Sequence, residues 1–132
     1  MYDATRLAEE LDLLRTRFRD LETREADGRT WVRLPSYSVP DGWQPSMVEL
    51  VFGFPAEVGQ PPYAFQVRPA LTLTNGGSPS NYTVGITNPW GDGFAQFSWA
   101  PDGPWVPNTD IRAGANMLNF AASFRTRLAE LS

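Results

Sequence analysis

Apolar residues recur every three to four positions near both ends of the chain, and short apolar runs lie between them. The N-terminal repeat contains Leu7, Leu11, Leu14, Phe18 and Leu21. This spacing predicts an amphipathic helix over residues 4–25, with Asp3 as N-cap and Asp27-Gly28 ending it. The repeat spans fewer than three heptads, so packing on a sheet is favoured over a coiled coil.

A second helix is predicted over residues 110–131, with Thr109 or Asp110 as its N-cap. Gly114 lies inside this range and lowers the helix propensity. The expected buried face is formed by Ile111, Leu118, Ala121, Ala122, Phe124, Leu128 and Leu131.

Three strand-like runs follow the first helix, at residues 30–34, 47–54 and 63–67. Their short connections are rich in proline and glycine, which is typical of an antiparallel meander. Residues 82–86 and 94–99 could form short strands or extended segments.

Two stretches rich in turn residues, 75–81 and 101–107, are predicted to be irregular. The resulting order is helix, antiparallel meander, irregular aromatic-rich segment and helix, which indicates the α+β class. We find no repeat and no linker, so residues 1–132 are expected to form a single domain.

Composition excludes several classes of function. The net charge of −4 and pI of about 4.7 argue against a nucleic-acid partner. No run approaches the ~18 apolar residues of a membrane span, so no membrane partner and a cytoplasmic location are expected. The chain has no cysteine and no histidine, which removes disulfides, thiolate metal sites and the commonest general base. We expect no cofactor and no metal.

Ser98 lies in the segment Phe97-Ser98-Trp99-Ala100-Pro101-Asp102-Gly103-Pro104-Trp105-Val106-Pro107, and Ile111 follows Trp105 by six residues. This segment resembles the active-site stretch of ubiquitin-conjugating enzymes, in which a nucleophilic cysteine precedes a Trp-x-Pro. Ser98 occupies the position of that cysteine. Phe54-Pro55 followed by Pro61-Pro62-Tyr63 is similar to a second signature of the family. The chain has no clear His-Pro-Asn motif ahead of Ser98.

The resemblance implies a ubiquitin-conjugating-like fold, closest to bacterial members encoded with a ubiquitin-like protein and an adenylating enzyme. It further implies that Ser98 accepts the activated C-terminus of the ubiquitin-like protein as an oxyester and passes it to a target amine. A serine hydroxyl is a weak acid and needs an adjacent base. The candidates are Asp102 and Asp110, and either would need a pKa raised by burial.

Other interpretations of Ser98 remain open. It could be a substituted cysteine, or an inert residue in a non-catalytic adaptor that binds the ubiquitin-like protein or the adenylating enzyme. A third alternative is a ligand-binding module lined by aromatic residues, among them Trp90, Trp99 and Trp105. Anchoring of the irregular segments to the core is the favoured interpretation of Trp90, Trp99 and Trp105.

The N-terminal helix docks the adenylating enzyme in the family, partly through basic residues. By this resemblance Arg6, Arg15, Arg17 and Arg19 are candidate contacts with that enzyme, although a solvated charged face is the simpler interpretation.

Overall fold

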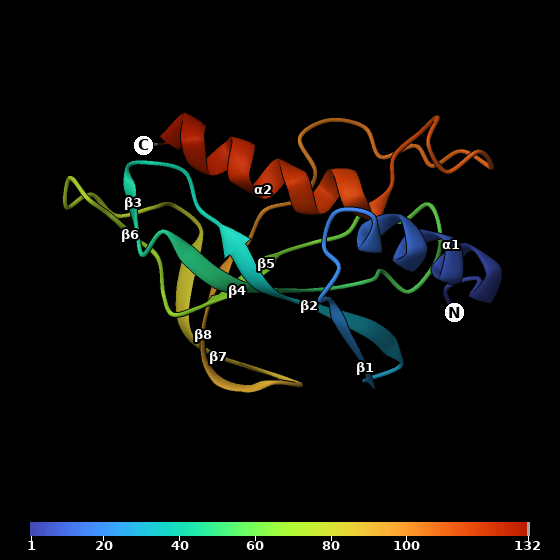
Figure 1. Ribbon diagram of the computed structural model, residues 1–132, viewed down its shortest axis with the longest axis horizontal. Helices are drawn as coiled ribbons and strands as arrows, with labels where there is room; N and C mark the ends of the chain where they lie inside the picture. The colour runs from blue at the N-terminus through green and yellow to red at the C-terminus, as the bar shows by residue number, and fades with distance from the viewer. Residues whose placement is uncertain (132) are drawn as a thin grey trace.

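Two helices lie on one face of a curled antiparallel sheet in the computed structural model, which describes residues 1–131 (Figure 1). The six-stranded sheet has the order β1-β2-β4-β5-β8-β7, and β3 and β6 form a separate pair. The elements are α1 (Ala4–Arg15), β1 (Glu22–Ala26), β2 (Arg29–Ser38), β3 (Trp43–Gln44), β4 (Met47–Gly53), β5 (Phe65–Arg68), β6 (Thr72–Leu73), β7 (Tyr82–Asn88), β8 (Gly91–Phe97) and α2 (Met117–Leu131).

The predicted α+β class, with an N-terminal helix, an antiparallel sheet and a C-terminal helix, is confirmed. The predicted meander is present as β2, β4 and β5, which are neighbours in the sheet and run antiparallel. The two segments left ambiguous by the sequence are strands: β7 and β8 form a hairpin that extends the sheet beyond β5. Within residues 1–131, neither α1 nor α2 combines the length and the apolar character that a membrane crossing requires.

The prediction of one helix over residues 4–25 is wrong in its second half. Helix α1 ends at Arg15, where Thr16 donates its hydroxyl to the Leu13 carbonyl at 2.6 Å. Residues 22–26 instead form β1, paired with β2 through a two-residue turn at Asp27 and Gly28. Both turn residues have positive φ, 54° and 74°, which matches the Asp-Gly hairpin turn. The predicted helix end at this dipeptide is therefore a hairpin turn.

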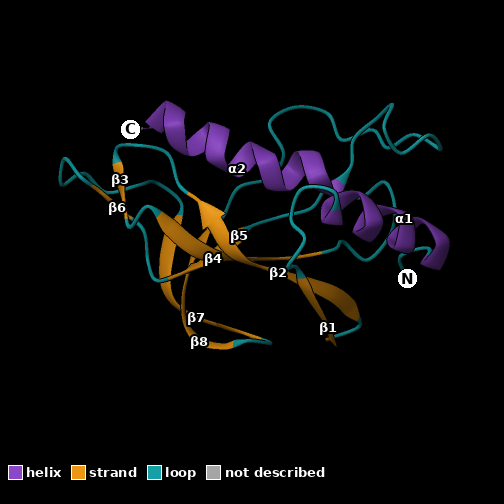
Figure 2. Cartoon of the chain, in the orientation of Figure 1, coloured by secondary structure: helices purple, strands orange, loops and turns teal. Residues whose placement is uncertain are grey.

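The second helix is shorter than predicted and begins at Met117 rather than residue 110. Asn116 is its N-cap, because its side-chain oxygen accepts from the Asn119 amide at 2.8 Å. Thr109 and Asp110 therefore do not cap α2. The backbone around Gly114 lies against another segment, and a Cβ there would lie 2.7 Å from the Val106 carbonyl oxygen. Residues 98–116 form a long connection without helix or strand (Figure 2).

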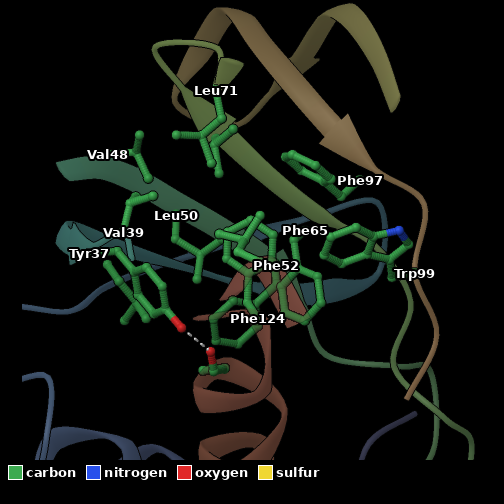
Figure 3. Close-up of a cluster of buried hydrophobic side chains, with 14 of the residues drawn as sticks. Tyr37, Val39, Val48, Leu50, Phe52, Phe65, Leu71, Phe97, Trp99 and Phe124 are labelled. Atoms are coloured by element: carbon green, nitrogen blue, oxygen red, sulfur yellow. Dashed lines mark hydrogen bonds between the residues drawn. The ribbon is translucent and has the colours of Figure 1, made fainter. Parts of the chain in front are cut away.

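The core between the sheet and α2 is dominated by stacked aromatic rings (Figure 3). Phe65 of β5 stacks on Phe120 and Phe124 of α2, with ring centroids 4.3 and 4.6 Å apart. Phe97 at the end of β8 packs edge-on against Phe124 at 5.3 Å. Because each ring buries a large apolar area, these contacts fix α2 across the middle of the sheet.

The opposite face of the sheet is covered in part by the β7–β8 hairpin. At its tip the Pro89 carbonyl accepts a hydrogen bond from the guanidinium of Arg24 in β1. The same guanidinium lies 5.1 Å from the Trp90 ring centroid. The hairpin thus joins the two edge strands of the sheet by side-chain contacts.

Candidate functional site

Ser98 directly follows β8 and is half-buried. Its backbone N–H donates to the Asn81 carbonyl at 2.8 Å, which ties the end of β8 to the residue before β7. Its side-chain oxygen lies on the same side of the strand as Gln96, two residues earlier, and accepts from the Gln96 amide at 3.2 Å.

This hydrogen bond is the last in a chain of side-chain amides across three strands. The backbone N–H of Trp90 donates to Asn88 Oδ1 at 2.9 Å, and Asn88 Nδ2 donates to Gln66 Oε1 at 2.8 Å. Gln66 Nε2 then donates to Gln96 Oε1 at 3.0 Å. A backbone N–H can only donate, so it sets the orientation of each following amide. The chain therefore makes the Ser98 oxygen an acceptor.

Neither predicted base forms a hydrogen bond with the Ser98 side chain. Among the hydrogen bonds of residues 1–131, none joins the Ser98 side chain to a carboxylate. Asp102 and Asp110 are both exposed, so the burial that a base for an alcohol would need is missing. Asp110 instead accepts from the Arg112 amide at 3.1 Å.

The three site residues predicted as catalytic are not brought together. Asp110 precedes the start of α2, whereas Trp99, next to Ser98, packs against Phe124 and Arg127 in the second half of that helix. Arg127 lies ten positions after Met117, which corresponds to about 15 Å of helix. A mechanism that uses Ser98 and Asp110 together is therefore not supported by the geometry.

The tryptophans near Ser98 pack against other side chains of the protein and do not project into solvent. Trp99 is 5% exposed, and Trp105 is half-buried with its ring edge-on to Phe120 at 6.3 Å. Trp90 lies under the Arg24 guanidinium at the hairpin tip. These three side chains do not form an exposed aromatic platform, which leaves the ligand-module alternative without support.

The predicted docking arginines of α1 fall into two groups. Arg6 is 8% exposed, and its guanidinium donates to the carbonyls of Asn108 and Ala115, so it anchors the segment before α2. Arg15 at the end of α1 is exposed, and so are Arg17 and Arg19 in the segment that follows it. These three can reach a partner, whereas Arg6 is engaged inside the protein.

A buried polar cluster at the junction of the two helices was missed by the sequence analysis. Glu10 is 1% exposed, and its carboxylate accepts from the Met117 amide at 3.1 Å and from the Tyr2 hydroxyl at 3.0 Å. Arg6 Nε lies 3.6 Å from the same carboxylate. Burial raises the pKa of Glu10 and also that of Tyr2. The i, i+4 spacing of Arg6 and Glu10 was a signal, but it equally fits an exposed pair.

A row of charges crosses the face of the sheet away from the helices. Glu49 of β4 pairs with Arg33 of β2 at 2.8 Å and with Arg68 of β5 at 2.7 Å, and Arg33 also pairs with Glu22 of β1. The hydrogen bond from Arg68 is the largest cause of the lowered pKa of Glu49. The row links four strands and offers no free catalytic group.

A polar groove of about 330 Å³ opens beside the end of β8 and was also missed. Its walls come from segments far apart in the sequence, so no local motif could have indicated it. They include Ser80, Asn81, Trp99, Asp102, Arg127 and Glu130. Of the predicted site residues, Trp99 and Asp102 line this groove.

No protein-family model, no curated protein and no solved structure matches this chain. Its function is therefore argued from the geometry around Ser98 and from the resemblance carried by its sequence motifs.

Proposed function

We propose that this chain is a non-catalytic ubiquitin-conjugating-like domain. It acts as an adaptor that binds the ubiquitin-like protein or the adenylating enzyme of a bacterial conjugation pathway in the cytoplasm. The proposal combines the sequence resemblance around Ser98 and Trp105 with an element order compatible with it: N-terminal helix, antiparallel sheet, irregular segment and C-terminal helix.

The environment of Ser98 is the observation that favours an adaptor over a serine relay. An alcohol becomes a nucleophile when a neighbouring base takes its proton. Here the Ser98 oxygen accepts a hydrogen bond from an amide, and the two candidate carboxylates, Asp102 and Asp110, make no hydrogen bond to it. The amide of Gln96 cannot take up the proton.

The test is intact-mass analysis after incubation with the adenylating enzyme, the ubiquitin-like protein and ATP. We expect a stable complex with one of the two partners and no covalent adduct, while the adenylating enzyme itself is charged. An adduct that resists thiol reductant, is cleaved by mild base and disappears in Ser98→Ala would overturn the proposal in favour of an oxyester relay. Absence of both adduct and complex would also overturn it.

The variant Ser98→Cys tests whether a stronger nucleophile at this position can accept the activated C-terminus. An adduct that forms with this variant but not with the chain that has Ser98 would agree with the adaptor proposal and equally with a substituted cysteine at position 98. It would show that the position can be reached by the activated C-terminus and that the hydroxyl is the limiting group.

A further inference from the structure

The loop that follows β6 contains Asn75-Gly76, the only place in the chain where glycine follows asparagine. Both residues are exposed, and the loop projects from the molecule at the left of Figure 1. The amide carbon of an asparagine side chain can be attacked by the backbone nitrogen of the next residue, which closes a five-membered succinimide ring. A side chain on that next residue hinders the attack, and Gly76 has none.

The Asn75 side chain is turned towards the backbone that follows it. Its Oδ1 accepts a hydrogen bond from the Gly77 N–H at 2.8 Å, and its Nδ2 forms no hydrogen bond within residues 1–131. Negative charge develops on Oδ1 when the carbon Cγ is attacked. The Gly77 N–H is placed to stabilise that charge, as a donor in an oxyanion hole does.

One hydrogen bond opposes the reaction. The Gly76 N–H donates to the Leu73 carbonyl at 3.1 Å, and this nitrogen must leave the bond and lose its proton before it attacks. Each of the two hydrogen bonds, at Gly76 and at Gly77, corresponds to a factor of about five in rate. Because the two factors act in opposite directions, the folded turn leaves Asn75 about as reactive as it is in an unfolded chain.

The other asparagines lack this combination of features. Asn88 precedes Pro89, whose nitrogen has no proton to lose. Asn116 is 4% exposed, and its Nδ2 donates to the Ile111 carbonyl at 3.0 Å. The remaining ones are followed by residues that carry bulkier side chains: Asn81, Asn108 and Asn119.

We propose that Asn75 is a site of spontaneous modification, at which asparagine is converted to aspartate and isoaspartate with water as the co-reactant. The Gly76 nitrogen gives its proton to solvent and bonds to Cγ of Asn75. The Cγ–Nδ2 bond then breaks, and the nitrogen takes up a proton and leaves as ammonia. Water opens the succinimide at Cγ, which gives aspartate, or at the main-chain carbonyl carbon, which gives isoaspartate.

The modified loop is connected to the end of α2. Strand β6 pairs with β3, and the Thr74 N–H donates to the Gly42 carbonyl at 3.0 Å. Trp43 of β3 is 4% exposed, and its indole N–H donates to the Leu128 carbonyl at 2.8 Å. Isoaspartate adds a methylene group to the main chain two residues after β6. Conversion of Asn75 therefore weakens the β3–β6 pair.

The test is peptide mapping by mass spectrometry after incubation at pH 8 and 37 °C in water labelled with ¹⁸O. The folded chain is compared with the same chain unfolded in guanidinium chloride, and incorporated ¹⁸O marks conversion that occurs during the incubation. We expect Asn75 to convert at comparable rates in the two samples and Asn88 to stay unchanged in both. Conversion of Asn75 that is more than about tenfold slower in the folded chain would overturn the proposal. Equal conversion of any other asparagine in the folded chain would also overturn it.

The variant Gly77→Pro removes the donor to Oδ1 and keeps Asn75-Gly76. We expect conversion to be roughly fivefold slower in the folded variant, and unchanged when both chains are unfolded. Ser78→Ala is the matched control, because the Ser78 side chain is exposed and forms no hydrogen bond within residues 1–131, and it should leave the rate unchanged. An unaltered Trp43 indole signal by ¹H–¹⁵N NMR shows that each variant is folded. Equal rates for folded Gly77→Pro and the unsubstituted chain would reject the role of the Gly77 N–H.

Hydrogen exchange after the incubation measures the effect on the fold. The amides of β3 should exchange faster in the converted chain, and those of β2 and β4 should not change. Asn75→Gln is the control, because glutamine would have to close a six-membered ring, and its exchange should be the same before and after incubation. Unchanged exchange of β3 in the converted chain, or an equal change in Asn75→Gln, would refute the effect on the β3–β6 pair.

Discussion

The structure differs most from the sequence-based expectations in the burial and the partners of single side chains. Glu10 and Arg6 occupy ordinary positions in an amphipathic helix, and their burial results from the later segment that packs over them. Asp102 and Asp110 lie near Ser98 in sequence, but both side chains are exposed. Position along the chain predicts neither burial nor partners when the segment involved is irregular, as residues 98–116 are.

Glu10 should make stability depend on pH in a defined direction. Because burial raises its pKa in the folded state, the folded chain binds this proton more tightly than the unfolded chain. The contribution of Glu10 to the free energy of unfolding therefore falls as the pH rises from the unfolded pKa through the folded pKa, and is constant above both values.

Urea unfolding of the natural chain and of Glu10→Gln across pH 4 to 8 measures this contribution. The stability of the natural chain relative to Glu10→Gln should be greatest at the acidic end and decline towards neutral pH. Exposed Glu9 provides the control, since Glu9→Gln should show no comparable decline. A relative stability that rises with pH would contradict the assignment.

At the scale of elements, periodicity located the helices but not their ends. The meander strands β2, β4 and β5 were predicted because their apolar positions face the core. Strand β1 was missed because its five residues are mostly charged or polar and show no alternation. It exists because the turn at Asp27 and Gly28 pairs it with β2, a local signal that had a second interpretation.

Gly114 distinguishes the predicted start of α2 from the observed one. In an exposed helix interior, Gly114→Ala would stabilise the protein by up to about 1 kcal/mol. In the structure the new Cβ would lie 2.7 Å from the Val106 carbonyl oxygen and 2.8 Å from the Asn108 amide nitrogen, both backbone atoms. We expect a loss of about 2 kcal/mol in the free energy of unfolding, measured by urea denaturation. A gain in stability would mean that the helix begins earlier than Met117.

For the molecule as a whole, the α+β class and the succession of helix, antiparallel meander and helix followed from the sequence. The curl of the sheet did not. The curl depends on contacts between the hairpin tip and β1, which are more than sixty residues apart: Trp90 Nε1 lies 3.4 Å from a carboxylate oxygen of Glu22. The groove at Trp99 and Arg127 likewise depends on segments joined by folding. Such long-range pairs leave no periodic signal in a single sequence.

Trp90→Ala should weaken the contact between the tip of the β7–β8 hairpin and β1 without unfolding α2. It removes the cation–π contact with Arg24, and we expect a loss of about 1–2 kcal/mol. Hydrogen exchange should become faster in β7 and β8 and remain unchanged in α2. Val84→Ala, at a side chain 65% exposed on the same hairpin, should change neither quantity. Faster exchange in α2 would indicate that the hairpin and the core unfold together.

The two edge strands of the sheet, β1 and β7, limit how another protein can bind to this one. Strand β1 carries Glu22, Arg24 and Glu25, and β7 is interrupted at Gly85, where φ is +75° and the pairing register shifts. Charged and irregular edges discourage another chain from adding a strand, which is also a defence against aggregation. Recognition by β-strand addition is thereby disfavoured, which leaves contacts through side chains as the way in which a partner docks.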